Sequence, residues 1–405
     1  MPYIGNIVQD FGVSNAMLNS DSVTSNKVLD GTIVNADINA SAAIAKTKLA
    51  ALEIVNADVN ASAAIAGSKI SPTFTTDGSF NSVSIGKGAN SVSNNTVLGE
   101  SALDAAVTGG SNTAIGTNSL TLNTSGNHNT AVGRNSQSAN TTGAANTSVG
   151  AFALDANTTA NSNSAFGYNS LTSNTTGTQN TGIGRNALHD NLTADNNTAV
   201  GFDALNATTT GANNTAIGVS ALKLNTTGTE NVAVGSFALD ANTTGNTNTA
   251  LGYVALSSNA TGVSNTAVGR AALFANTGSN NTGIGKEALK LNTTASNNTA
   301  VGTSALLVNT TGGNNTAVGV EALQANTTGD INSAFGHNAL HDNTTGEGNV
   351  ALGRNALFNN ETADHNVAVG YDAVFYNTTG ADNVGVGHQA LYNNTTAANN
   401  VAVGK

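Results

Sequence analysis

The stretch NTAVGTSALLVNTTGGNNTAVG, residues 298–319, begins and ends on the same five letters and carries no charged side chain. Its closing glycine recurs along the chain from Gly99 to Gly404. Seventeen of the eighteen intervals between these glycines are 17 residues long, and the interval from Gly269 to Gly285 is 16. A fixed period of this length is typical of stacked repeat architectures.

Counted from each of these glycines, the consensus is GxxALxxNTTGxxNTAV, and we number its columns from 0 (Gly) to 16. Asn occupies column 13 in all eighteen repeats and column 7 in sixteen. Asn tolerates left-handed backbone angles in turns, and stacked amides form side-chain ladders, so column 13 is predicted to join neighbouring rungs. The first ten residues of this predicted structural ladder are Asn112, Asn129, Asn146, Asn163, Asn180, Asn197, Asn214, Asn231, Asn248 and Asn265.

The apolar columns predict how the repeat is stabilised. Column 4 is Leu in sixteen repeats, column 16 is Val, Ile, Leu or Phe, and two columns are mostly Ala. Burying the two larger side chains with both Ala is worth about 5 to 8 kcal/mol. Ordering 17 residues costs about 25 kcal/mol. One repeat therefore cannot fold alone, and stacking on its neighbours must supply the difference.

The composition of the repeat predicts an all-β fold. Thr, Asn and Gly disfavour helices, so we expect a parallel β-roll or β-solenoid of 17-residue rungs. Each rung would hold a strand at NTAVG and a second extended piece around xALxx. Eighteen rungs would measure roughly 85 to 90 Å. The missing residue of the short interval falls within 275–283, which marks a loop. Because the rung is short and its core small, we expect an intertwined homotrimer.

The first part of the chain follows a different pattern. TIVNADINASAAIAKTKLA (32–50) returns 21 residues later as EIVNADVNASAAIAGSKIS (53–71), which predicts a shaft of mixed β and short helical repeats. The predicted organisation is an attachment segment (1–31), this shaft (32–75), a transition (76–98) and the repeat β-roll (99–405).

Charge and composition exclude several classes of function. The net charge is −11 with 13 Lys plus Arg, and no basic run is present, which argues against nucleic acid as a partner. The absence of Cys excludes thiolate sites. No apolar run approaches the roughly 18 residues of a membrane span, and the start has no leader pattern. No nucleophile, base and acid can be assembled and no cofactor motif is present, so we expect a protein that is not an enzyme.

Two resemblances suggest a function. SVSIGKGANS and the serial NTAVG, NTAIG, NVAVG and NSAFG resemble the repeats of trimeric autotransporter adhesin heads, which are left-handed parallel β-rolls of three chains, although the period there is about 14. The MPYIGN start and the twin IVNAD units look like the virion-proximal part of bacteriophage tail fibres. The second resemblance implies a trimeric virion fibre that binds a virion or tail protein through its N-terminus and a host-surface glycan or protein elsewhere. The first implies a bacterial surface adhesin head.

Candidate binding residues gather in the last repeats. Column 5 should point outward, and there it reads His341, Phe358, Phe375 and Tyr392, with Tyr371 and Tyr376 nearby in sequence. Such a stripe predicts either a platform for a host receptor or aromatic packing that stiffens the tip.

The Leu-His-Asp motifs and the Thr columns each allow more than one interpretation. Leu-His-Asp recurs at 188–190 and 340–342, but an outward column favours solvated surface over a metal site. Regular Thr columns raise ice binding as a further alternative, although Val replaces Thr at column 14 in Val232, Val350, Val367, Val384 and Val401, which predicts a half-buried column.

Overall fold

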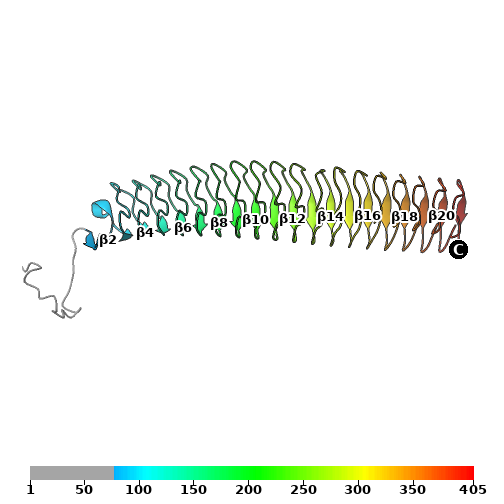
Figure 1. Ribbon diagram of the computed structural model, residues 1–405, viewed down its shortest axis with the longest axis horizontal. Helices are drawn as coiled ribbons and strands as arrows, with labels where there is room; N and C mark the ends of the chain where they lie inside the picture. Colours follow the sequence, from blue (N-terminus) through cyan, green and yellow to red (C-terminus); the bar gives the residue numbers. More distant parts are fainter. Residues whose placement is uncertain (1–76) are drawn as a thin grey trace, which may run out of the picture. The chain divides into compact units, whose positions relative to one another are not determined.

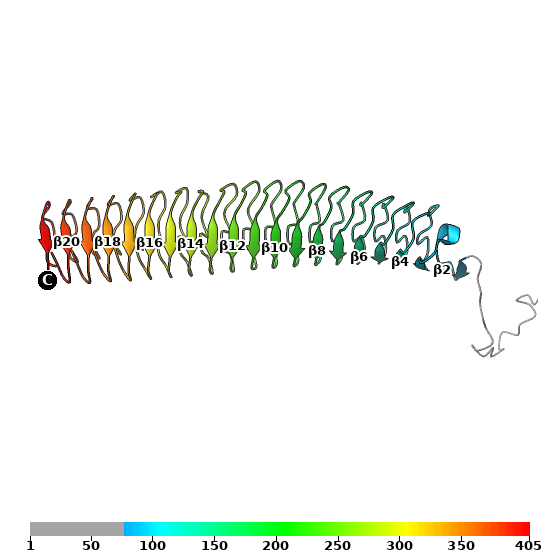
Figure 2. The same ribbon diagram turned by 180° about the vertical axis from the view of Figure 1, so that it is seen from behind.

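The computed structural model describes residues 77–405, so the predicted segments 1–31 and 32–75 lie outside the described residues. The described part is all-β, and its strands form one row in both views (Figures 1 and 2). Each rung from β3 onward contributes one three- or four-residue strand. The strands are β1 (Gly78–Phe80), β2 (Val83–Gly86), β3 (Thr96–Gly99), β4 (Thr113–Ile115), β5 (Thr130–Val132), β6 (Thr147–Val149), β7 (Ser164–Phe166), β8 (Thr181–Ile183), β9 (Thr198–Val200), β10 (Thr215–Ile217), β11 (Val232–Val234), β12 (Thr249–Leu251), β13 (Thr266–Val268), β14 (Thr282–Ile284), β15 (Thr299–Val301), β16 (Thr316–Val318), β17 (Ser333–Phe335), β18 (Val350–Leu352), β19 (Val367–Val369), β20 (Val384–Val386) and β21 (Val401–Val403).

The strands from β3 to β21 pair in parallel, each with the strand one repeat away, which confirms the predicted β-solenoid. Thr299 pairs with Thr316, for example, and Val301 with Val318. The short repeat keeps this register, since Thr266 pairs with Thr282. The missing residue therefore falls in the turn, as the sequence predicts.

The transition segment forms a cap at the N-terminal end of the solenoid. β2 pairs antiparallel with both β1 and β3, and the 3₁₀ turn η7 (Ala89–Ser91) follows it. The backbone N–H of Ala89 donates to the carbonyl of Leu103 at 3.1 Å, which joins the cap to the first rung.

The core of each rung is smaller than predicted. Columns 3, 4 and 15 are buried, as in Ala305, Leu306 and Ala300. Column 16 was predicted to be in the core, and this is wrong: Ile284 is 40% exposed. Successive strand residues point to opposite faces, and the small column 15 is the one that points inward. In most rungs the chain closes its own core from two Ala and one Leu.

The backbone between strands is not extended, which corrects the predicted second extended piece around xALxx. Ser304 in column 2 and Leu306 in column 4 have φ of 57° and 49°. A left-handed Leu costs roughly 1 to 2 kcal/mol. Rung-to-rung bonds hold it in place, because the Leu306 N–H donates to the Ala322 carbonyl at 3.0 Å. The alternating turns let a 17-residue rung close around so small a core.

The column-13 ladder is present, with one correction. The left-handed residue is in column 12, as in Asn314 (φ 54°), and not the ladder Asn itself. The Asn129 N–H donates to Asn112 Oδ1 at 2.9 Å, and Asn112 Nδ2 donates to the Gly126 carbonyl at 2.9 Å. The ten Asn residues predicted for this ladder are all fully buried. Each amide therefore satisfies two backbone groups of the following rung.

Column 7 forms a second ladder, between amides. Asn140 Nδ2 donates to Asn123 Oδ1 at 2.8 Å and to the Gly143 carbonyl of its own rung at 3.0 Å. Where Thr208 replaces Asn, both its hydroxyl and the Oδ1 of Asn191 are buried without a partner. The ladder therefore has a break at this rung.

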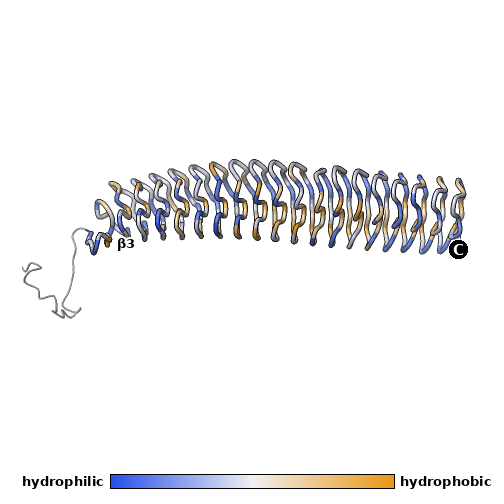
Figure 3. Tube along the Cα trace, in the orientation of Figure 1, coloured by the Kyte–Doolittle hydropathy of each residue, from blue (hydrophilic) through white to orange (hydrophobic). Residues whose placement is uncertain are grey.

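One rung has a polar core. Gln137 replaces the column-4 Leu, and its Nε2 donates to the Ser148 hydroxyl at 2.8 Å and to the Thr130 carbonyl at 3.1 Å. The Ser148 hydroxyl also bonds to that of Ser136, and Gln137 Oε1 has no partner. The apolar core consequently falls into two clusters, one ending at Ala131 and the other beginning at Ala153. Elsewhere, hydrophobic and hydrophilic residues recur at the same places from rung to rung (Figure 3).

Candidate functional site

The column-5 aromatics of the last rungs form one continuous stack. The ring centroids of His341 and Phe358 are 4.9 Å apart, those of Phe358 and Phe375 5.1 Å, and those of Phe375 and Tyr392 5.4 Å. The ring planes of the first two pairs are nearly parallel, with interplanar angles of 0° and 8°. All four side chains are half-buried. The repeat thus places equivalent rings above one another at the rung spacing.

Stacking determines which ring surfaces a ligand can reach. Phe358 lies between His341 and Phe375, and Phe375 lies between Phe358 and Tyr392, so both faces of each Phe are covered. Their outer surface is an edge, which carries the positive part of the ring quadrupole. A sugar that stacks on an open ring face therefore has no such face on these two residues.

Tyr376 lies beside this stack. Its ring meets those of Phe375 and Tyr392 edge to face, at 4.8 and 5.1 Å, and it is exposed. A hydrogen bond between Tyr392 and Tyr376, with some burial and nearby Asp372 and Tyr371, raises the pKa of Tyr392 above its usual 10.0. The Tyr392 phenol therefore stays neutral at physiological pH, and both tyrosines carry a hydroxyl group that can donate and accept hydrogen bonds.

Tyr371 belongs to a different column from the other predicted site residues. It occupies column 1, where its ring stacks on His388 at 5.4 Å and lies 5.7 Å from the guanidinium carbon of Arg354. The predicted set is therefore two parallel columns, one on column 5 with Tyr376 beside it and one on column 1.

The outward face of the sheet carries an apolar row that the sequence reading assigned to the core. Column 16 is half-exposed or exposed in every rung, with Phe166, Ile217 and Leu352 among its larger members. Column 14 flanks it and is half-buried in most rungs, as the Thr-to-Val exchanges predict. Continuous exposed apolar surfaces of this extent commonly take part in protein–protein contacts.

The two Leu-His-Asp motifs form local pairs. His189 Nδ1 lies 2.6 Å from Asp190 Oδ1, and His341 Nδ1 lies 2.6 Å from Asp342 Oδ1. Residues 77–405 contain no group of three His, Cys, Asp or Glu placed to hold a metal ion. His341 instead takes part in the aromatic stack.

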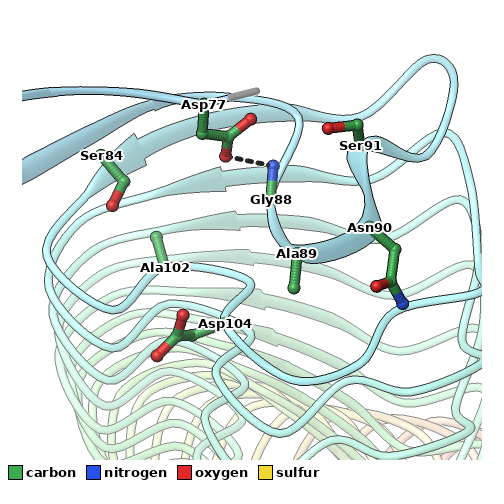
Figure 4. A pocket seen from close by; sticks show the side chains of 8 residues that line it. All are labelled: Asp77, Ser84, Gly88, Ala89, Asn90, Ser91, Ala102 and Asp104. Carbon is green, nitrogen blue, oxygen red and sulfur yellow. Dashed lines mark hydrogen bonds between the residues drawn. The ribbon is translucent and has the colours of Figure 1, made fainter. Parts of the chain in front are cut away.

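A pocket of about 520 Å³ lies at the N-terminal cap (Figure 4). Its carboxylates are those of Asp77 and Asp104. Asp77 accepts hydrogen bonds from the backbone N–H of Lys87 at 2.7 Å and Gly88 at 2.6 Å, so its oxygens already hold the cap turn. The lining residues are Asp77, Ser84, Gly88, Ala89, Asn90, Ser91, Ala102 and Asp104.

Sequence reasoning missed the outward row of column 16 and the pairing of His388 with Tyr371. A usable signal for the first was residue size. Column 15 accepts Ala, Gly or Ser in every strand after β3, whereas column 16 ranges from Val to Phe. A strict size limit indicates the inward side of a crowded core more reliably than hydrophobicity does.

Comparisons with known proteins add no family to this geometry. No family model matches the chain, and no curated protein shows significant similarity to its sequence. Within residues 77–405, no helix is long and apolar enough to cross a bilayer.

Proposed function

We propose that this chain is a structural and adhesive fibre protein of a bacteriophage tail. In this role three chains form a stiff spacer that attaches to a virion or tail protein through the N-terminal segment and carries host-recognition groups on outward columns of the rungs. The protein acts by geometry and avidity, without catalysis and without a cofactor.

The observation that carries this proposal is the unbroken parallel ladder from β3 to β21. Every rung is joined to the next by strand pairing, by the column-13 amides and, at most rungs, by the column-7 amides. At about 4.8 Å per rung, the eighteen steps span roughly 86 Å. Such a body suits a spacer, because bending it requires many of these bonds to lengthen together.

Self-association is part of this proposal. The half-exposed column 16 gives each chain an apolar row along the whole sheet, which a soluble fibre must cover. The resemblance to trimeric fibres and adhesin heads favours three copies.

Host recognition is proposed for the two aromatic columns near the C-terminal rungs. Of the predicted site residues, Tyr376 and Tyr371 are the exposed ones, and each combines a hydroxyl group with an apolar ring edge; the hydroxyl of Tyr376 is hydrogen-bonded to Tyr392. Surface glycans and proteins offer both hydroxyl groups and apolar patches, so either receptor class fits. The inner rings Phe358 and Phe375 would hold these residues in place rather than contact the receptor.

A bacterial trimeric adhesin head is the second candidate, supported by the NTAVG-type strands. Ice binding is a third, supported by the Thr of column 14 on the outward sheet face. Immuno-electron microscopy separates the first two: antibody against residues 99–405 should label the tail fibres of a virion. Labelling of a bacterial envelope alone would favour the adhesin. Thermal hysteresis of the purified chain would favour ice binding.

A binding assay tests the recognition residues. Replacing Tyr371 and Tyr376 together with Ser should abolish adsorption of the labelled fibre to host cells. The matched control is Tyr168→Ser with Tyr253→Ser, which changes exposed column-1 tyrosines far from the last rungs. Equal loss in both variants, or undiminished adsorption of a folded Tyr371/Tyr376 variant, would place recognition elsewhere.

A further inference from the structure

The charges in the outer columns that flank the strand row, columns 1, 11 and 12, differ in sign between its two sides. Column 2, next to column 1, carries the acids Asp203, Glu287, Glu321 and Asp372, but these are buried or half-buried. Column 1 follows each strand, and columns 11 and 12 precede the next one. In the repeats, the cations of column 1 are Arg134, Arg185, Arg270, Lys286, Arg354 and Lys405, and the one acid in this column is Glu100. All of these cations are exposed.

The opposite side of the strand row is acidic. Columns 11 and 12 contain Asp195, Glu230, Asp330, Glu347, Asp364 and Asp382. They contain neither Lys nor Arg in any repeat, and their two His residues are His128 and His365. The apolar row of column 16 therefore runs between a basic flank and an acidic flank.

From this sorting we propose that copies of the chain associate through the outward sheet face in parallel, with their N-terminal ends together. The inference rests on the self-association in the proposed function and adds the surface and the direction. The occupant of the apolar row is a second copy of this chain.

Symmetry connects the charges to the direction. A rotation axis parallel to the solenoid brings the flank after the strand on one chain against the flank before the strand on its neighbour. The basic side then meets the acidic side, whether two or three chains surround the axis. An antiparallel face-to-face pair instead brings basic against basic and acidic against acidic, which is unfavourable.

The levels of the charges agree with a parallel arrangement. Glu347 lies shortly before β18 (Val350–Leu352) and Arg354 shortly after it, so in a parallel assembly the two groups stand at one level on neighbouring chains. Arg185 follows β8 and Asp195 precedes β9, one rung away. Of the flank charges, Arg270 pairs with Glu287 of its own chain at 3.5 Å, and Asp382 lies 3.9 Å from His365. Arg185, Asp195, Glu347 and Arg354 form no ion pair within residues 77–405, so they remain available to a neighbour.

Single cysteines distinguish the two directions, because the chain has none of its own. Val149 at the end of β6 and Leu352 at the end of β18 are equally far from the central strand β12, and both are exposed. The full chain is prepared as Val149→Cys and as Leu352→Cys, and the two are mixed, reassembled and oxidised. A parallel assembly gives disulfides between identical positions. A fully overlapping antiparallel assembly joins Val149→Cys to Leu352→Cys.

Thr328→Cys is the matched control, since it is exposed on the turn and not on the sheet face. It should remain uncrosslinked under the same oxidation. Mass spectrometry of the crosslinked peptides identifies the partners, and circular dichroism checks that each variant is folded.

Charge exchange gives an independent readout by sedimentation. Arg354→Glu should weaken association about three- to tenfold, because it meets Glu347 of the neighbour. Adding Glu347→Arg in the same chain should restore it, and high salt should reduce both effects. In an antiparallel pair the residue facing Arg354 would be the neutral Ala151, so neither change would matter. A chain that stays monomeric overturns the self-association itself, whereas an oligomer with mixed disulfides overturns only the direction.

Discussion

The break in the column-7 ladder provides a quantitative test of what the ladder contributes. Thr208 stands where sixteen other rungs carry Asn, and its hydroxyl and the Oδ1 of Asn191 are both buried without partners. Thr208→Asn should restore the ladder at this rung. Its new Nδ2 would donate to Asn191 Oδ1, and its Oδ1 would accept from Asn225 Nδ2, as the equivalent amides do in Asn123 and Asn140.

The expected gain follows from the two added bonds. A buried neutral hydrogen bond contributes about 1 kcal/mol net, and leaving such a group unpaired costs about 1 to 3 kcal/mol. We therefore expect Thr208→Asn to stabilise the surrounding rungs by about 2 kcal/mol. Stacked repeats are coupled mainly to their neighbours, so the effect should be strongest near β9 and β10.

Native-state hydrogen exchange is the suitable assay, because it resolves local opening where a global melting curve does not. A gain of about 2 kcal/mol corresponds to about thirtyfold slower exchange of the amides that open together. The amides near β18 should be unchanged.

Two matched variants complete the test. Thr208→Val removes the unpaired hydroxyl but leaves Asn191 Oδ1 unpaired, so it should yield about half the gain. Asn242→Thr introduces the same break into an intact part of the ladder and should cost about 2 kcal/mol. Unchanged or faster exchange in Thr208→Asn, with the fold intact, would show that the amide ladder contributes little to stability.

Three further predictions concern other parts of the solenoid. Gly319→Ala should destabilise β16 and β17 by about 3 kcal/mol or more, because φ is 146° and an added Cβ would meet the Gly336 carbonyl oxygen at 2.3 Å; Gly313→Ala is the neutral control, and urea unfolding measures both. Because the apolar core is divided at the rung of Gln137, we expect the described solenoid to unfold in two calorimetric transitions. Gln137→Leu combined with Ser148→Ala should join the two clusters and merge these transitions into one; two transitions that persist in the variant would contradict this. Tyr376→Phe should return the pKa of Tyr392 towards 10.0, as seen by NMR titration. Because the folded state holds the Tyr392 proton more tightly than the unfolded state does, this proton stabilises the fold fully below pH 10.0, and the stabilisation is lost as pH rises through the higher pKa of the folded state. If the pKa of Tyr392 does not change in the variant, the shift comes from burial instead.

The repeat period and the Asn columns were sufficient to predict parallel stacking. An amide present at all eighteen repeats, such as Asn112 and its equivalents, has few explanations other than a ladder between rungs. The position of the missing residue, between Gly269 and Gly285, likewise showed which part of the repeat is a turn and which is a strand. These features are visible in the sequence because the same backbone groups must be hydrogen-bonded in every rung.

The inward direction of the strand could not be obtained from hydrophobicity. Val301 is more apolar than Ala300, yet Ala300 is the buried one, because the turns on either side leave space for a methyl group only. Those turns depend on left-handed residues such as Leu306, which no local propensity favours. Stacking imposes that backbone, so it emerges only when neighbouring rungs are present.

The candidate site was predictable as a set of residues but not as a surface. The sequence placed Phe358, Phe375 and Tyr392 in one column, and the structure brings them into contact. The sequence does not show whether a ring presents its face or its edge, because this depends on contacts with the rings of neighbouring rungs. In the structure these contacts leave Tyr376 exposed and half-bury the column-5 rings. Adsorption of the Tyr371/Tyr376 variant to host cells tests the proposed role of Tyr376.

In the ladders, each rung is hydrogen-bonded only to the rung before it and the rung after it. Adding or removing a whole 17-residue repeat would leave every such bond with an equivalent partner and change the span by about 4.8 Å. Gene duplication within the repeat region can therefore tune reach in fixed increments without redesigning either end. The length of the solenoid can therefore change in steps of one repeat while the bonds between rungs stay the same.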